Sequence, residues 1–144
     1  MKKLSVVIPA YNEEKRITAT LKSVDGYLEK QVYDYEIIVI DNNSKDRTSE
    51  VVRELEATTV QKSAVKLVTT PGKGAAVKEG LLKYCSGDIV MFMDADNATP
   101  ISEIEKFLPY FDQGYDVVIG SRYTEPDLVK VHQPLYRIVL SRMS

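Results

Sequence analysis

Five short runs rich in β-branched residues recur along the chain, separated by stretches in which apolar residues have helical spacing. The runs predict strands over Leu4–Ile8, Glu36–Ile40, Val65–Val68, Asp88–Met93 and Asp116–Ile119. Their nearly continuous apolar character is typical of strands buried on both faces, as in a parallel sheet covered by helices. The alternation predicts an α/β fold, a Rossmann-like, open and mostly parallel sheet with helices on both faces and right-handed crossovers.

Helices are predicted where apolar residues recur every three or four positions. The two strongest patterns are Ile17, Leu21, Val24 and Leu28, and Ile101, Ile104, Leu108 and Phe111. Weaker helices are expected over residues 48–56 and 74–84. Leu135–Met143 predicts a helix that has only begun when the sequence stops at Ser144. We therefore expect a core over residues 1–123 and, in residues 124–144, the start of a further segment of a longer protein.

The bulk composition narrows the class of protein. A chain of 144 residues, 44% hydrophobic and 28% charged, suffices for one globular domain with a core. The net charge of −2 supplies no overall field that attracts nucleic acid. Cys85 is the one cysteine, expected as a buried or half-buried thiol, and it suits a reducing compartment. No stretch approaches the roughly 18 apolar residues of a membrane span. We expect a cytoplasmic setting.

Polar residues gather where the predicted strands end. The segments concerned are 9–13, 41–46, 69–74, 94–97 and 120–122. In an open parallel sheet, ligands bind outside the carboxyl ends of the strands. Asp, Asn, Lys, Gly and Arg dominate these segments, which predicts a functional site at this edge of the sheet.

Asp94 and Asp96 directly follow the apolar run of residues 89–93. Two carboxylates at i and i+2 can face one divalent cation when the chain turns between them, and Mg²⁺ and Mn²⁺ favour such oxygen ligands. A cation also cancels the repulsion between the like charges. The plain alternative is a solvated turn that caps the next helix, because an isolated D-x-D pattern is common. Asp41 ends a second buried strand, and neighbouring strand ends would bring it towards the same crevice.

Further candidates carry less weight on their own. Lys73 lies between two glycines before a predicted helix, where backbone amides favour anions, but a plain glycine turn fits equally well. Arg122 follows the last predicted strand, where its guanidinium can pair with phosphate. Arg137 and Ser141 are four residues apart, one turn of the predicted final helix, and an exposed helix face is the alternative there.

Three motifs follow one another at predicted strand ends: VVIPAYNE over residues 6–13, IDNNSKDRT over residues 40–48 and DAD over residues 94–96. Together they resemble the inverting family 2 glycosyltransferases of GT-A fold, and the resemblance covers essentially the whole chain. GKGAAV from residue 72, DADNAT from residue 94 and GSR from residue 120 look most like the dolichyl-phosphate β-glucosyltransferases of that family. The dolichyl-phosphate mannose synthases are the close alternative.

The resemblance implies roles for single residues. Those implied to line the nucleotide pocket are Pro9, Ala10, Tyr11, Glu13, Asp41, Lys73 and Asp94. Those implied to act in catalysis are Asp94, Asp96 and Arg122, with Asp94 and Asp96 as ligands of Mg²⁺ or Mn²⁺ on the donor diphosphate. Those implied at the acceptor phosphate are Arg122, Arg137 and Ser141.

The implied activity is metal-dependent transfer of a hexose, with inversion, from a nucleotide sugar to a polyprenyl or dolichyl phosphate at the cytoplasmic face of a membrane. UDP-glucose is the favoured donor and GDP-mannose the alternative. The acceptor phosphate is already an anion near neutral pH, so no general base is required. Arg122 and Arg137 would then position it and match its charge.

Three departures from the family pattern bear on the donor. Asn42 and Asn43 replace the usual Asp-Gly, which leaves the contact to the base open. Ala98 stands where the mannose synthases carry a metal-binding Gln, which favours the glucosyl branch or a water in its place. Thr70-Pro71 replaces the usual Arg/Asn-rich lead, so the sequence only leans towards glucose.

This sequence lacks the signatures of three other classes of protein. A dinucleotide-dependent oxidoreductase needs G-x-G-x-x-G after the first strand, where this chain has PAYNEE. A sugar-nucleotide pyrophosphorylase needs a Gly-rich, Arg-containing first loop. A phospho-receiver domain, the non-enzymatic rival, needs an acidic pair after the first strand and a Lys after the last. A chain that binds the donor without completing catalysis stays an alternative.

Overall fold

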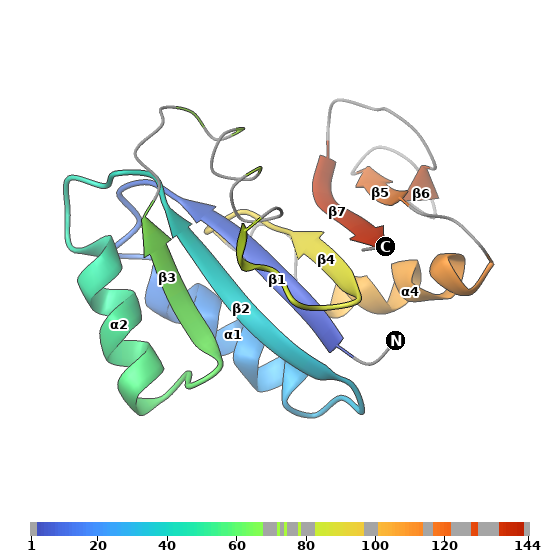
Figure 1. The fold of residues 1–144 in the computed structure, drawn as a ribbon, viewed down its shortest axis with the longest axis horizontal. Helices are drawn as coiled ribbons and strands as arrows, with labels where there is room; N and C mark the ends of the chain where they lie inside the picture. The colour runs from blue at the N-terminus through green and yellow to red at the C-terminus, as the bar shows by residue number, and fades with distance from the viewer. Residues whose placement is uncertain are drawn as a thin grey trace.

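One sheet of seven strands, counted over the described residues, forms the centre of the computed structural model (Figure 1). The structure describes residues 3–67, 72, 74, 78, 83–96, 101–113, 117–121, 128–129 and 136–142, and from residue 117 on it describes the backbone. The first half of the chain contains β1 (Lys3–Ala10), α1 (Ile17–Leu28), β2 (Asp34–Asp41), α2 (Thr48–Thr58) and β3 (Ser63–Leu67). The second half contains β4 (Ile89–Phe92), the 3-10 helix η2 (Ile101–Glu103), α4 (Ile104–Asp112), β5 (Val117–Ser121), β6 (Leu128–Val129) and β7 (Tyr136–Arg142).

The strand order is β3-β2-β1-β4-β7-β5-β6. The first four strands of this order pair in parallel, which confirms the predicted parallel sheet. Strand β7 is antiparallel to both β4 and β5, so β5 runs in the same direction as β4, and β6 is antiparallel to β5. The predicted strands are all present, with ends that differ by a few residues.

The predicted helix over residues 135–143 is wrong, because residues 136–142 form the strand β7. This strand lies between β4 and β5 and pairs with both. Arg137 and Ser141 are therefore not one helical turn apart. Four residues of a strand separate two Cα atoms by about 13 Å, against about 6 Å along a helix. Tertiary pairing, which local spacing does not report, decides the conformation here.

One face of the sheet is covered by α1, α2 and α4. In Figure 1, α1 lies behind β1 and β2, and α2 lies beside β3. The residues of α1 predicted to face the core, Ile17, Leu21, Val24 and Leu28, are fully buried. They pack in one apolar cluster with the even-numbered residues of β1, with Val52 of α2 and with Ile104 of α4. The helical spacing thus predicted the buried sides of these helices.

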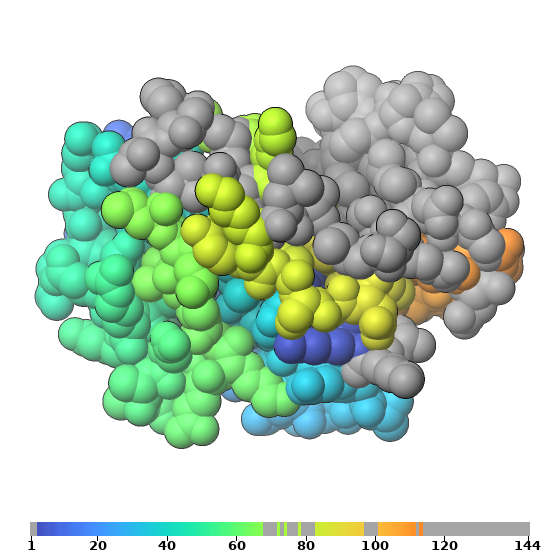
Figure 2. All heavy atoms as spheres, in the orientation of Figure 1, coloured from blue at the N-terminus to red at the C-terminus, as the bar shows by residue number. Residues whose placement is uncertain are grey.

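The opposite face carries a second, smaller apolar cluster. Val7, Ile38 and Val90 form its core, and Tyr84 and Cys85 pack against it. Figure 2 shows the yellow segment that begins near residue 83 lying over the strands on this side. Cys85 is half-buried, as expected, and burial raises the pKa of its thiol to about 11. Most of the helix predicted over residues 74–84 falls outside the described residues.

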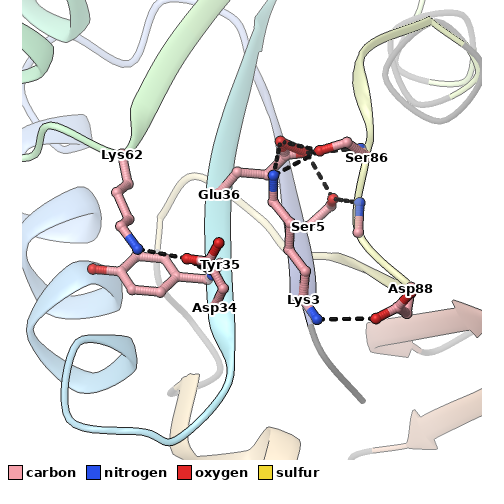
Figure 3. A network of polar contacts seen from close by, with 9 residues as sticks. Lys3, Ser5, Asp34, Tyr35, Glu36, Lys62, Ser86 and Asp88 are labelled. Carbon is pink, nitrogen blue, oxygen red and sulfur yellow. Dashed lines mark hydrogen bonds and ion pairs between the residues drawn. The ribbon is translucent and has the colours of Figure 1, made fainter.

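A polar network at the amino ends of β1 and β2 holds the segment that leads into β4 (Figure 3). Glu36 accepts hydrogen bonds of 2.8 Å from the Ser5 hydroxyl and the Ser86 amide, and Lys3 Nζ lies 3.3 Å from its carboxylate. The Gly87 amide donates to Ser5 Oγ at 2.7 Å. Burial raises the pKa of Glu36, but the hydrogen bonds from Ser86 and Ser5 and the contact with Lys3 outweigh it, and the pKa is lowered. The network thereby fixes the chain just before β4 begins.

Among the described helices, none is long and apolar enough to cross a membrane.

Candidate functional site

The carboxyl ends of β1, β2 and β4 lie at one edge of the sheet. Ala10 at the end of β1 is in register with Asp41 at the end of β2. Phe92 at the end of β4 is in register with Val7, and the Met93 amide continues the ladder with a 3.0 Å hydrogen bond to the Val7 carbonyl. The predicted site residues of segments 9–13, 41–46 and 94–96 therefore come together, as the sequence predicted.

The loops after β1 and β2 are joined directly by hydrogen bonds. The Asn12 amide donates to Ser44 Oγ at 2.9 Å, and the Lys45 amide donates to Asn12 Oδ1 at 2.7 Å. Asn12 adopts a left-handed conformation with φ of 55°, which asparagine tolerates better than most residues. Next to it, the amide of the buried Glu13 donates to Thr48 Oγ1 at 2.9 Å. The two loops thus form one continuous rim.

Asp41 holds the second loop in shape. Its side chain is buried, and Oδ1 accepts a 2.9 Å hydrogen bond from the Ser44 amide while Oδ2 accepts one from the Ser49 hydroxyl. A carboxylate has about four acceptor positions, so these two bonds leave capacity for a ligand. The side chains predicted to line the pocket differ in exposure: Tyr11 is 54% exposed, whereas Ala10 and Glu13 are buried.

Asp46 reinforces the same rim from the start of α2. Its carboxylate accepts hydrogen bonds from the Thr48 hydroxyl, from the Thr48 amide at 3.0 Å and from the Glu14 amide at 3.2 Å. Partial burial raises the pKa of Asp46, but the bonds from Thr48 and Glu14 outweigh it and lower the pKa. The carboxylate is therefore held in its charged form beside the loop after β1.

The turn that carries the two predicted metal ligands rests on α1. Asp94 is half-buried and Asp96 exposed, while Ala95 between them is buried. The Thr20 hydroxyl on α1 donates a 2.5 Å hydrogen bond to the Ala95 carbonyl. One helical turn earlier, Arg16 forms an ion pair with Glu13. The pKa of Arg16 is raised chiefly by Glu13, with a smaller contribution from the negative charge of Asp96.

The donor set at this turn fits a hard divalent cation that keeps open positions. Within the described part of the chain, no three His, Cys, Asp or Glu side chains form a group that could hold a metal ion. Asp94 and Asp96 offer carboxylate oxygens from one turn at the solvent side of the sheet edge. Mg²⁺ in particular is usually held by one or two carboxylates, with waters and substrate phosphates completing its shell. Two carboxylates therefore suffice if a diphosphate supplies the rest.

Several predicted residues lie outside the described part of the chain or are described only by their backbone. Lys73 and Arg122 are not described. Gly72, beside Lys73, has φ of 105°, a conformation that favours glycine. In β7, Ser141 pairs with Val90 of β4 and with Val117 of β5, which places it inside the sheet. Gly120 pairs with Ile138 but Ser121 with Tyr136, so the register shifts around Arg137.

Some residues at this edge were not predicted from the sequence. Thr20 and Arg16 are separated by more than 70 positions from the D-x-D turn they approach, and no local pattern links them to it. Ser44 and Thr48 lie within the second motif, but nothing in the sequence links them to the first loop. A signal was present at Arg16, because a positive charge at a helix start runs against the usual preference for acids there.

Residues 5–142 match the protein family described as Glycosyl transferase family 2. The chain belongs to this family. The predicted family is thereby confirmed, and similarity to solved glycosyltransferase structures confirms the predicted fold class. One curated relative is a dolichyl-phosphate beta-glucosyltransferase of Trichomonas vaginalis, 38% identical over 95% of this chain and 45% of its own length.

The second relative is a dolichol-phosphate mannosyltransferase of Pyrococcus furiosus, 36% identical over 97% of this chain and 38% of its own length. This chain thus spans less than half the length of either. A similar solved structure is glucosyl-3-phosphoglycerate synthase from Mycobacterium tuberculosis in complex with Mn²⁺ and UDP-glucose. It is 26% identical, with a TM-score of 0.71, and the match covers 98% of this chain and 56% of that one.

Proposed function

We propose that this chain is the donor-binding part of an inverting glycosyltransferase that moves a hexose from a nucleotide sugar to a polyprenyl or dolichyl phosphate. The observation that carries the proposal is the meeting of three loops at one sheet edge in a family 2 chain. The loops after β1 and β2 share a hydrogen-bonded rim, and the Asp94–Asp96 turn lies on α1 beside it. Such an arrangement offers one side to a nucleoside and another to a diphosphate.

On this proposal, the nucleoside lies against the first two loops. Pro9, Ala10, Tyr11 and Glu13 line its pocket, and Asp41 faces the base or ribose from the end of β2. Lys73 lies near the donor. The rim is held by hydrogen bonds from backbone amides to the short side chains of Asp41 and Asn12 rather than by long flexible side chains, so the two loops are largely preorganised.

Asp94 and Asp96 hold a divalent cation, Mg²⁺ or Mn²⁺, at the donor diphosphate. When bound, such a cation supplies charge stabilisation for the departing diphosphate. The bond between the sugar anomeric carbon and the diphosphate oxygen breaks as an acceptor phosphate oxygen attacks from the opposite face, which inverts the configuration. The acceptor is already anionic, so the chain need only position it, and Arg122, Arg137 and Ser141 are the residues proposed for this.

Glucose is the favoured sugar and mannose the second candidate. The glucosyl assignment is supported by the 38% identity to the T. vaginalis glucosyltransferase, and the mannosyl one by the 36% identity to the P. furiosus enzyme. A lipid phosphate acceptor would place the protein at the cytoplasmic face of a membrane, as a peripheral association of this part of the chain.

Calorimetric titration of UDP into the chain, with Mn²⁺ and then with EDTA, tests the role of the acidic turn. We expect Asp96→Ala to abolish the Mn²⁺-dependent part of the affinity, because one of two protein ligands is lost. Asp34→Asn is the matched control, since Asp34 is exposed at the opposite end of β2. Equal Mn²⁺-dependent binding by Asp96→Ala and the wild type would refute the assignment of Asp96.

A further inference from the structure

Two exposed apolar side chains lie at the proposed donor edge. In the described part of the chain, three large apolar side chains are exposed: Tyr11, Val32 and Leu67. Val32 lies between α1 and β2, just before β2 begins, whereas Tyr11 follows β1 and Leu67 ends β3. A single exposed apolar residue needs no explanation, but two at one edge beside a candidate ligand site indicate a contact made when a ligand binds.

The sheet places Leu67 directly beside Asp41. Strands β1, β2 and β3 are parallel neighbours, and their carboxyl ends lie at one edge (Figure 1). Ala10 at the end of β1 is in register with Asp41, and Asp41 is in register with Leu67. Neighbouring strands are about 4.8 Å apart, so the ends of β1 and β3 lie about 10 Å apart with Asp41 between them.

Ala10, Asp41 and Leu67 share one face of the sheet. Residues in register on parallel strands point to the same face, and side chains alternate along each strand. Ala10 belongs to the larger apolar cluster on the helix-covered face, and Asp41 accepts its hydrogen bond from Ser49 of α2 there. Val65, two residues before Leu67, packs against the same cluster. Leu67 therefore points to this face, yet it is 56% exposed while Asp41 beside it is 3% exposed.

Apolar side chains on either side of a carboxylate suit a nucleobase. A base has two flat faces that pack on aromatic and apolar side chains, and a polar edge that forms hydrogen bonds. A flat ring between two layers of carbon atoms needs about 7–8 Å between those layers. The separation of about 10 Å between the ends of β1 and β3 accommodates such a ring.

We propose that Leu67 contacts the base of the donor nucleotide, which lies between Leu67 and Tyr11 with its polar edge towards Asp41. The inference rests on the proposed function and adds a residue that the proposed function does not include. Every base has flat faces of the same kind, so Leu67 contributes affinity for the nucleoside and leaves the choice of base to the polar groups of the loop after β2.

Calorimetric titration of UDP in the presence of Mg²⁺ measures the contribution of Leu67. In Leu67→Ala, we expect the affinity for UDP to fall about fivefold, because the apolar surface that the base covers is lost. Leu67→Phe offers a larger flat surface and should bind UDP at least as tightly as the wild type. Val32→Ala is the matched control, since it removes an exposed apolar side chain at the other end of β2, and it should leave the affinity unchanged.

Nuclear Overhauser effects give a second measurement, which a general change in the site would not produce. Mg²⁺ is used because it is diamagnetic, unlike Mn²⁺. The methyl protons of Leu67 should show intermolecular effects to the ring protons of uracil in bound UDP. These signals should be absent in Leu67→Ala and retained in Val32→Ala.

The outcomes distinguish this inference from the function on which it rests. If the wild type binds UDP and Leu67→Ala binds it equally well, or if Leu67 shows no effect to the base, the contact is refuted and the function stands. A loss of affinity in Leu67→Phe as large as that in Leu67→Ala would also refute it, because a larger flat side chain should still pack on the base. If the wild type itself binds no UDP with Mg²⁺ or Mn²⁺, the proposed function fails first.

Discussion

Gly87 shows how strongly a single residue can be constrained by its neighbours. A Cβ placed there would lie 2.6 Å from Ser5 Oγ, 2.7 Å from the Ser5 amide nitrogen and 2.9 Å from the Lys3 carbonyl. Two of these three atoms belong to the backbone of β1, which cannot move without shifting the strand. The close approach lets the Gly87 amide reach the buried Ser5 hydroxyl.

Gly87→Ala should therefore lower the free energy of unfolding by about 1–3 kcal/mol, the usual cost of overpacking. Gly26→Ala is the matched control, because a Cβ at that position in α1 meets no atom within 4 Å. That change should stabilise the chain by about 0.5–1 kcal/mol, since alanine is the better helix former. Urea unfolding of both variants checks the pair, and equal stabilities would contradict the close packing at Gly87.

The Glu36 carboxylate makes the stability of the fold depend on pH in the acid range. Its pKa is lowered in the folded chain, below its ordinary value, by the hydrogen bonds from Ser86 and Ser5. A carboxylate of this kind adds stability above its unfolded pKa and loses it as the pH falls through the folded pKa. Glu36→Gln cannot titrate, so it should be less stable than the wild type at pH 7 but lose less stability on acidification below about pH 4.5.

Unfolding in urea at a series of pH values from 7 to about 3 measures this difference. Glu56→Gln, which replaces an exposed glutamate of α2, serves as the control and should keep the wild-type pH dependence. Asp34 and Asp46 also have lowered pKa values, so part of the acid sensitivity stays in every variant. A pH profile of Glu36→Gln that parallels the wild type would count against the network.

At the scale of elements, α1 connects the core to the candidate site. Its buried side packs on β1, while Thr20 supports the Asp94–Asp96 turn through the Ala95 carbonyl. Thr20 is 1% exposed, so neither its hydroxyl nor that carbonyl can replace the bond with bulk water. The position of the turn thus depends on a helix that begins about 80 residues earlier in the chain.

Thr20→Val keeps the shape of the side chain but removes the hydroxyl. We expect a loss of about 1–3 kcal/mol in the free energy of unfolding, because a buried carbonyl is left without its donor. Affinity for UDP with Mn²⁺ should fall as well, since the turn loses its support. Thr18→Val, a half-buried position on the same helix, is the control, and both variants are compared by urea unfolding and calorimetry. Identical behaviour of the two would contradict a supporting role for Thr20.

Elements differ in how far local sequence predicts them. The strands ending at Ala10 and Asp41 are central and parallel, so their continuous apolar runs were recognisable, and the strand-end rule then brought their polar ends together. Residues 136–142 also contain an apolar run, Ile138-Val139-Leu140, but periodicity alone does not separate a short strand from a helix. Pairing with β4 and β5 decides between them, and both partners are distant in sequence.

The residues of the candidate site also differ in how far the sequence predicts them. Its acidic and loop residues could be predicted because they directly follow strands, and the family resemblance added their roles. The side chain that supports the acidic turn could not be predicted, because Thr20 reaches the Ala95 carbonyl across a long sequence separation. This contact exists only once α1 has packed beside the turn after β4.

At the scale of the whole molecule, the parallel half of the sheet and its three loops form the edge that we propose binds the donor. The chain covers 45% and 38% of the lengths of the two curated relatives, and the roles of Arg122, Arg137 and Ser141 at an acceptor are proposals. The property proposed for this chain itself is metal-dependent binding of a nucleotide sugar.

That claim is tested most directly by calorimetric titration of UDP-glucose and GDP-mannose into the chain, each with Mn²⁺ and with EDTA. We expect UDP-glucose to bind more tightly than GDP-mannose and EDTA to remove most of its affinity, because the diphosphate is proposed to be held through a cation on Asp94 and Asp96. Tighter binding of GDP-mannose would move the assignment to mannose and leave the site intact. Absence of binding by both donors, or binding that EDTA leaves unchanged, would contradict the proposed donor site.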